Sequence, residues 1–78
     1  MPKLPIMKAK DAHKWLLKYG CEHMNVNSSH YKIMNPVNGK SSTVPIHGGR
    51  DLKKGTLAAI LRQLDIDVVL FLAFIENN

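Results

Sequence analysis

A chain of 78 residues is long enough for one domain, and at this size it buries only about 60% of its unfolded surface, so the core is small. Its apolar content of 45% is too high for a disordered tail. The apolar run from Val68 to Ile75 is far shorter than the roughly 20 residues of a membrane-spanning helix, so we expect no membrane association. A single cysteine excludes an intramolecular disulfide, and no signal-like segment opens the sequence, so the expected location is the cytoplasm.

Positive charge is concentrated in the first part of the chain. The net charge is +5, but residues 1–54 hold ten Lys and Arg against three acidic residues, whereas residues 55–78 hold one Arg against three. A basic body followed by a mildly acidic, apolar tail predicts two surfaces, one for a polyanion such as a nucleic acid and one for a protein. The alternative is a solvated basic face that has no partner.

The N-terminal part predicts an extended arm followed by a helix. Residues 1–9 include two prolines, which favour extended backbone. The helix is expected from Lys10 to Gly20, because its apolar side chains recur at the i, i+3, i+4, i+7 spacing of one buried face. The residues of this face are Ala12, Trp15, Leu16 and Tyr19. Away from it, Lys14 and Lys18 continue a stripe of positive charge that begins at Lys10.

Three segments of alternating polarity follow and predict a three-stranded antiparallel meander. They cover residues 21–27, 29–35 and 41–47. The dipeptide Asn38-Gly39, between the last two segments, is a strong hairpin signal. Pro45 cannot donate a hydrogen bond to a ladder, so its strand is expected at an edge of the sheet.

The turn sets the register of this hairpin. If Asn38 and Gly39 are its two central residues, Ile33 pairs with Val44, and both strands then turn apolar side chains to one face. An alternative remains open, in which Pro36 ends the first of the two strands early and the loop is wider.

With the two-residue turn, the opposite face brings two histidines together. His30 lies across from His47, and Lys32 is next to them. Imidazole exchanges protons near neutral pH, and a neighbouring cation stabilises the additional negative charge of a phosphorane-like transition state. This arrangement predicts metal-independent RNA cleavage, in which the ribose 2′-hydroxyl attacks the adjacent phosphate. The alternative is a pair of exposed strand histidines without a catalytic role.

A metal site is the competing interpretation, and the spacing disfavours it. Cys21, His23, His30 and His47 could project from one sheet face, but structural zinc sites use tight ligand pairs such as C-x₂-C or H-x₃₋₅-H. The only close pair in the sequence is Cys21-x-His23. We therefore expect neither a metal ion nor another cofactor.

The C-terminal part predicts two further helices. The first, at residues 56–65, has Gly55 or Thr56 as its N-cap. Its buried face consists of Leu57, Ile60, Leu61 and Leu64. The second, at residues 67–78, is capped by Asp67 and is apolar on more than one side, which favours a contact with a second copy or with another protein. The residues expected to make this contact are Val68, Phe71, Leu72 and Ile75.

The order of these elements predicts an α+β fold. It reads α-β-β-β-α with a short additional C-terminal helix, so that helices cover one face of a three-stranded antiparallel sheet. We expect a single domain over residues 1–78, composed of the extended arm at 1–9, a core at 10–66 and the apolar helix at 67–78.

The sequence also resembles the HicA (YcfA-like) mRNA interferase toxins, from Met1 to about Ile66. The most specific shared segments are Val44-Pro45-x-His47, Gly55-Thr56-Leu57 and Ile60-Leu61-Arg62-Gln63. The resemblance implies a double-stranded-RNA-binding-like fold, toxicity through mRNA cleavage, and neutralisation by a HicB-like antitoxin. The family's catalytic histidine lies in a Gly-Ser-His motif, which corresponds here to Ser28-Ser29-His30, so that Ser28 replaces the glycine.

We therefore assign proton transfer to His30, with His47 and Lys32 as its assistants. In a double-stranded-RNA-binding fold, lysines at the start of the last main helix contact phosphates, and recognition is mainly by shape. The residues expected to hold the RNA backbone are Lys53, Lys54, Arg50, Lys14 and Lys18. Two alternatives stay open: a non-catalytic RNA-binding module of the same fold, and a protein-interaction subunit that uses the apolar tail.

Overall fold

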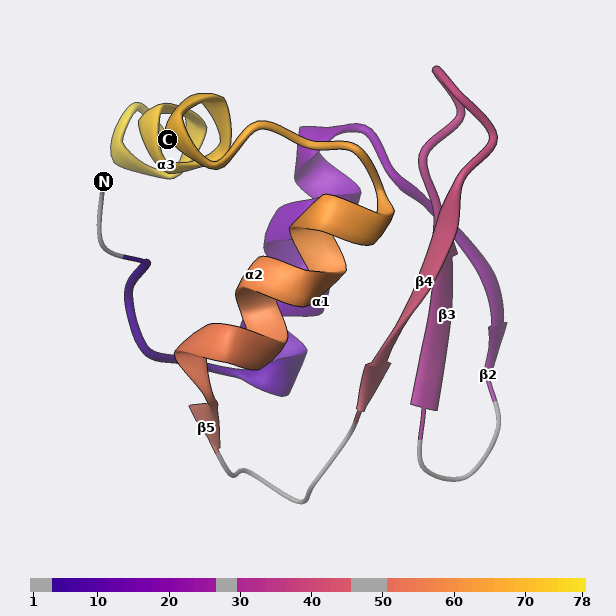
Figure 1. Cartoon of the computed structure of the whole chain (residues 1–78), viewed down its shortest axis with the longest axis horizontal. Coiled ribbons are helices and arrows are strands. Elements are labelled where there is room, and N and C mark those ends of the chain that lie inside the picture. The colour runs from indigo at the N-terminus through magenta and orange to yellow at the C-terminus, as the bar shows by residue number, and fades with distance from the viewer. Residues whose placement is uncertain (1–3, 27–29, 46–50) are drawn as a thin grey trace.

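The computed structural model describes residues 4–26, 30–45 and 51–78 of the chain. Its elements are β1 (Met7–Lys8), α1 (Ala9–Tyr19), β2 (Glu22–Val26), β3 (His30–Met34), β4 (Ser41–Pro45), β5 (Asp51–Leu52), α2 (Lys54–Gln63) and α3 (Val68–Glu76). This order contains the predicted α-β-β-β-α succession and the predicted C-terminal helix (Figure 1).

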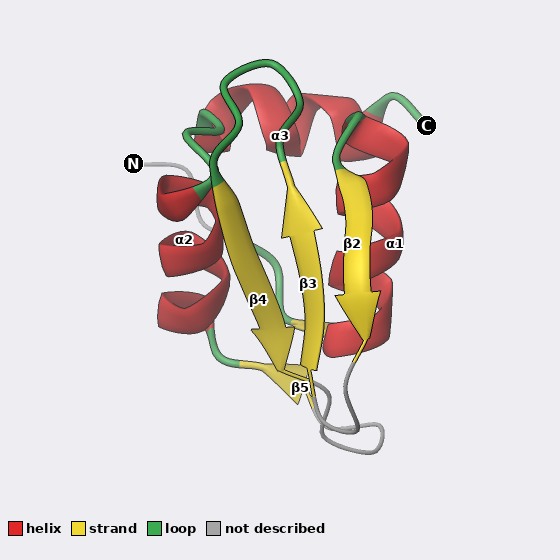
Figure 2. Ribbon diagram, turned by 90° about the vertical axis from the view of Figure 1, so that its right-hand side faces the viewer, coloured by secondary structure: helices red, strands yellow, loops and turns green. Residues whose placement is uncertain are grey.

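The molecule has a sheet layer and a helix layer. Strands β2, β3 and β4 form an antiparallel sheet in that order, and α1 and α2 lie on one of its faces (Figure 2). The predicted α+β class and the placement of the helices on one face are thus confirmed. Pro45 lies at the end of β4, an edge strand, where its missing N–H leaves no gap in the ladder, as predicted.

The core lies between these layers, and the helix faces predicted from apolar spacing supply most of it. Leu16 of α1 and Leu61 of α2 are 0% exposed, and so are Ile33 of β3 and Val44 of β4. The other buried apolar residues in this cluster are Leu4, Ala9, Ala12, Cys21, Leu52, Leu57, Ile60, Leu64, Ile66 and Phe71. Because alternate residues of β3 and β4 enter this core, the residues between them face solvent on the other side of the sheet.

The register predicted for the β3–β4 hairpin is wrong. Ile33 pairs with Ser42, and His30 pairs with Pro45, so the strands are displaced by two residues from the register of a two-residue turn. A displacement of two residues keeps every side chain on its expected face, which is why the inward face is still correct. The predicted cross-strand pair of His30 and His47 does not form in this ladder, and His47 lies outside the described residues.

The cause is a wider turn, the alternative that Pro36 offered. β3 ends at Met34, and the N–H of Asn35 donates to the carbonyl of Lys40 at 2.8 Å. The carbonyl of Asn35 in turn accepts a hydrogen bond of 2.8 Å from the N–H of Gly39, whose φ of 74° suits glycine. The turn therefore closes with the pair Asn35 and Lys40, and four residues lie between them, where the sequence predicted a two-residue turn.

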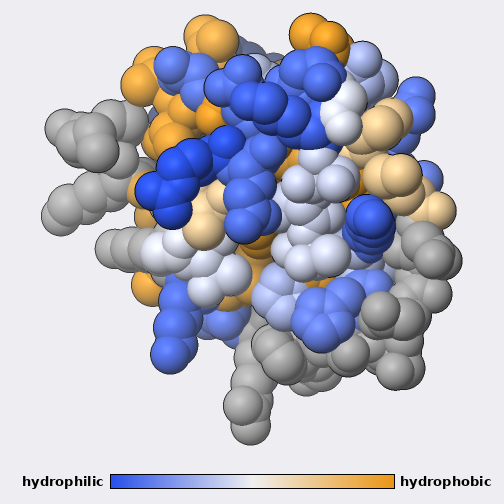
Figure 3. Space-filling model, turned by 45° about the vertical axis from the view of Figure 1, so that its right-hand side comes forward, coloured by the Kyte–Doolittle hydropathy of each residue, from blue (hydrophilic) through white to orange (hydrophobic). Residues whose placement is uncertain are grey.

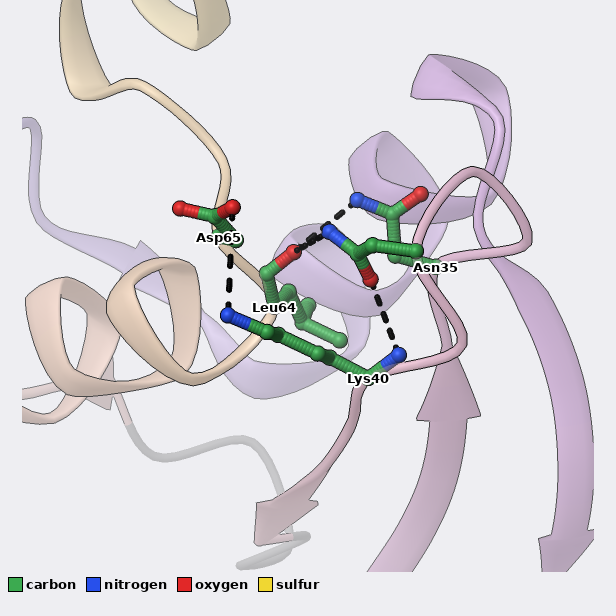
Figure 4. Close-up of polar contacts among 5 residues, drawn as sticks. Asn35, Lys40, Leu64 and Asp65 are labelled. Carbon is green, nitrogen blue, oxygen red and sulfur yellow. Dashed lines mark hydrogen bonds and ion pairs between the residues drawn. The ribbon is translucent and has the colours of Figure 1, made fainter.

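This turn is attached to the end of α2 (Figure 4). The side-chain amides of Asn35 and Asn38 both donate to the carbonyl of Leu64, at 2.9 and 3.1 Å. Such bonds satisfy a carbonyl that the end of a helix would otherwise leave unpaired. The ion pair between Lys40 and Asp65, at 3.9 Å, joins two exposed side chains and contributes little to stability.

The N-terminal arm forms a short ladder that the sequence did not predict. Met7 of β1 pairs with Leu52 of β5 in an antiparallel arrangement, and these two-residue strands are too short to show an alternating pattern. β5 leads directly into α2, whose N-cap is Lys53. The predicted caps, Gly55 and Thr56, are wrong: they lie inside the first turn of the helix.

The C-terminal helix α3 packs against the C-terminal half of α1, on the side away from the sheet (Figure 1). Its predicted cap is confirmed, since the carboxylate of Asp67 accepts from the N–H groups of Val69 and Leu70 at 2.8 and 3.2 Å. Phe71 is 0% exposed, and its ring centroid lies 5.5 Å from that of Tyr19. Across the described parts of the chain, no helix combines the length and apolar character needed to cross a membrane.

The face of α3 that was expected to contact another protein therefore packs largely against its own chain. Phe71 belongs to the buried core, and the half-buried Val68, Leu72 and Ile75 pack against that core. The large apolar side chains that α3 leaves exposed are Val69 and Leu70, at 57% and 61%. A contact between α3 and another protein stays a prediction, but Phe71 needs no such partner for its burial.

Candidate catalytic histidine and nucleic-acid interface

His30 is the first residue of β3, the central strand of the sheet, and its side chain is exposed. Ile33 of the same strand is buried under the helices, so strand alternation turns His30 and Lys32 to the opposite, solvent-facing side. Lys32 is also exposed and pairs with Thr43 of β4. The structure therefore brings the predicted catalytic histidine and the predicted lysine to one open face of the sheet.

This face joins the N-terminal end of α2 at one end of the molecule. The start of β3, the end of β4, the short strand β5 and the start of α2 all lie at the same end (Figure 2). Lys53 is the exposed N-cap of α2, and the N-terminus of a helix carries a partial positive charge that attracts phosphate. Lys54 begins the helix, and only its backbone is described. Arg50 lies outside the described residues, as His47 does.

The lysines of α1 are exposed, as predicted, but they lie farther than Lys53 from the end of the molecule that holds His30. α1 begins beside β5 and runs toward the opposite end of the molecule (Figure 1). Lys18 lies in its last turn, with its Nζ atom 5.3 Å from the centre of the Trp15 ring. Lys14 lies one turn earlier. These two lysines could contact phosphates only of an RNA that extends along the helix, whereas Lys53 shares an end with His30.

The surface combines a polar area with hollows at both ends of the molecule. Hydrophilic residues dominate the middle of the space-filling view, and apolar ones gather toward the side on which α3 lies (Figure 3). One hollow of about 380 Å³ is formed at the end away from the candidate site, where the β3–β4 turn meets α3. Its lining includes Tyr19, Cys21, Val37, Asn38, Asp65 and Leu70. A second hollow, of about 450 Å³, lies at the candidate end and is lined by Ile6, Asp51, Leu52 and Lys53, so this end offers both an open sheet face and a hollow next to Lys53.

Two histidines that the sequence did not assign to a site meet on the inner side of the sheet. The Nε2 atom of His13, on α1, lies 3.2 Å from the Nδ1 atom of His23, on β2. The ring of Tyr31 stacks on that of His13 with 4.2 Å between centroids. Burial lowers the pKa of His13, and the charge of His23 lowers it further. The sequence contains no local signal for this cluster, because it depends on how β2 pairs with β3.

The competing metal interpretation grouped Cys21, His23, His30 and His47, of which His47 lies outside the described residues. Cys21 is buried at the start of the sheet, and burial raises the pKa of its thiol. Within residues 4–26, 30–45 and 51–78, no three Cys, His, Asp or Glu side chains converge in a way that could hold a metal ion.

Comparisons with known proteins identify relatives that share most of this chain. The family described as "HicA toxin of bacterial toxin-antitoxin" matches residues 9–66. A curated relative from Pseudomonas fluorescens (strain Pf0-1), "Probable mRNA interferase HicA", is 33% identical over 60 residues, which are 77% of this chain and 97% of the relative. No solved structure matches the chain. The region matched by the family includes both β3 and the start of α2, where the candidate site lies.

Proposed function

Since this chain belongs to the HicA family of toxins from bacterial toxin–antitoxin systems, we propose that it is an mRNA interferase with His30 as its catalytic residue. The observation that carries this assignment is the position of His30: an exposed imidazole at the start of the central strand, at the same end of the molecule as the N-terminus of α2. The reaction is an endonucleolytic cleavage of RNA that requires no metal ion.

His30 acts as the base. Its imidazole takes the proton of a ribose 2′-hydroxyl while that oxygen forms a bond to the adjacent phosphorus, and the bond from phosphorus to the 5′ oxygen breaks. The leaving 5′ oxygen takes a proton from water, so the products are a 2′,3′-cyclic phosphate and a 5′-hydroxyl. Lys32, on the same face of the sheet, offsets the additional negative charge that the phosphorus centre carries in the transition state. His47 is not needed for this scheme.

The RNA backbone binds at the end of the molecule that includes Lys53 and Lys54. The partial positive charge at the N-terminus of α2 adds to that of the two lysines, and phosphates bind such helix termini well. The α-β-β-β-α order is similar to that of double-stranded-RNA-binding domains, which recognise shape and backbone more than sequence. Arg50, Lys14 and Lys18 extend this contact when the RNA is long enough.

A HicB-like antitoxin neutralises the toxin. α3 offers it the exposed side chains of Val69 and Leu70, which add apolar area at the rim of the face formed by Val68, Leu72 and Ile75. The same surface of a second copy is the alternative occupant.

The test is RNA cleavage by the purified, tag-free chain, with and without excess EDTA and with and without the antitoxin encoded beside it. We expect cleavage that yields 5′-hydroxyl ends, persists in EDTA and stops when the antitoxin is added. RNA binding without cleavage would identify a non-catalytic RNA-binding module. Self-association without any affinity for RNA would identify a protein-interaction subunit.

A further inference from the structure

The contact between His13 and His23 joins two elements that are distant in the sequence. His13 lies in the second turn of α1 and is half-buried, whereas His23 lies on the edge strand β2 and is exposed. The ring of Tyr31 stacks on that of His13, and the two imidazoles meet edge to face with 5.3 Å between their centroids. The cluster faces the helix layer, while His30 faces solvent on the other side of the sheet, so the proposed cleavage does not use it.

The two ring nitrogens have the separation of two ligands of one metal ion. Zinc binds imidazole nitrogen at about 2.0–2.1 Å, so two such ligands lie about 3.0 Å apart at a right angle and about 3.4 Å apart at the tetrahedral angle. The observed distance of 3.2 Å between His13 Nε2 and His23 Nδ1 falls between these limits. We propose that His13 and His23 bind a divalent transition-metal ion such as Zn²⁺ or Ni²⁺ through these two atoms, with water completing the coordination.

The chemistry of both rings fits this role. Imidazole binds metal ions in its neutral form, through a nitrogen that carries no proton. In the metal-free pair, one of the two ring nitrogens carries a proton and donates a hydrogen bond to the other. A bound metal ion would replace this proton. Because His23 is exposed, water can reach the ion, as a site with only two protein ligands requires.

A bound ion would connect α1 to β2 and so stabilise the folded chain. A ligand that binds only the native state raises its stability by mass action. The site lies apart from His30, so metal binding and RNA cleavage are separate properties, and the failure of one does not imply the failure of the other.

The test is thermal unfolding of the tag-free chain in EDTA and in a series of Zn²⁺ and Ni²⁺ concentrations. We expect Tm to rise by about 4 °C or more at saturating metal. His13→Gln and His23→Gln should each abolish this rise, whereas His30→Gln should retain it. No rise in the wild-type chain at millimolar metal, or an equal rise in both variants, would overturn the proposal.

A second measurement does not depend on whether the variants fold. Imidazole resonances of the wild-type chain can be followed by NMR during a Zn²⁺ titration. We expect the largest shifts at His13 and His23, together and with one binding curve. Shifts confined to the other two histidines, His30 and His47, would contradict the assignment of the site.

Discussion

His30 lies directly opposite Pro45 in the β3–β4 ladder. The residue across from the candidate catalytic imidazole is therefore a ring without an ionisable group, so it cannot exchange a proton with the substrate as a second histidine would. Proton transfer by a single imidazole is the simplest chemistry for such a site, and Lys32 is the cation placed on the same face.

The role of His47 can be tested by its replacement with Ala. With Pro45 in the position opposite His30, the cross-strand argument for His47 no longer holds, and we expect His47→Ala to cleave RNA within a few-fold of the wild-type rate. Single-turnover cleavage of a defined RNA measures this directly. A loss of about 100-fold or more, the scale of positioned acid–base catalysis, would show that His47 takes part by a route other than this ladder.

RNA binding should depend strongly on salt, because lysines that neutralise phosphates release counterions. Changing Lys53 and Lys54 to Gln should reduce the slope of log affinity against log salt by about one for each lysine that contacts a phosphate. Lys40→Gln is the matched control, since Lys40 follows the β3–β4 turn at the opposite end of the sheet and pairs with Asp65. Equal slopes for the wild-type chain and the double variant would place the RNA surface elsewhere.

The attachment of the hairpin turn to α2 should contribute measurably to stability. Asn35→Ala removes the hydrogen bond to the carbonyl of Leu64 and the one that Asn35 accepts from the N–H of Val37, at 2.9 and 3.1 Å. We expect a decrease of about 1–2 kcal/mol in the free energy of unfolding, from urea titration at an unchanged m-value. Asn77→Ala, which removes an exposed hydrogen bond at the end of α3, should change it by no more than about 0.5 kcal/mol. Equal effects of the two changes would contradict the structural role of the turn.

Burial of α3 by its own chain predicts a large effect at Phe71. Phe71→Ala should lower the free energy of unfolding by about 3–5 kcal/mol, the usual cost of removing a fully buried aromatic ring. Val69→Ala, at a site that is 57% exposed, should change it by no more than about 0.5 kcal/mol. The wild-type Tm should also be independent of protein concentration. A Tm that rises with concentration would show that a second copy also contributes to the burial of this helix.

The features that the sequence predicted correctly are those that depend on local periodicity. Leu16 and Leu61 are buried because their helices repeat apolar residues at the spacing of one face, and Ile33 is buried because its strand alternates. Asp67 caps α3 because a carboxylate before a helix accepts from the first free N–H groups. Gly20 ends α1 with a φ of 126°, which glycine adopts without strain.

The features that the sequence did not predict depend on pairing between distant segments. Two registers of the hairpin keep Ile33 inside, so the alternating pattern cannot distinguish them, and hydrogen bonds at Asn35 decide between them. The contact of His13 with His23 also requires the β2–β3 ladder, which has a β-bulge between His23 and Asn25. No pattern within one segment predicts such a bulge or the distance between residues on different elements.

The catalytic role of His30 is tested most directly by the single-turnover cleavage rate of His30→Ala on a structured RNA. Thr43→Ala, an exposed change on the same face of the sheet, is the matched control, and circular dichroism and urea unfolding check that both variants fold. We expect His30→Ala to cleave about 10²–10⁴-fold more slowly than the wild-type chain, with its stability changed by no more than about 0.5 kcal/mol, and Thr43→Ala to cleave at nearly the wild-type rate. A folded His30→Ala chain that cleaves RNA as fast as the wild-type chain would contradict the assignment of catalysis to this histidine.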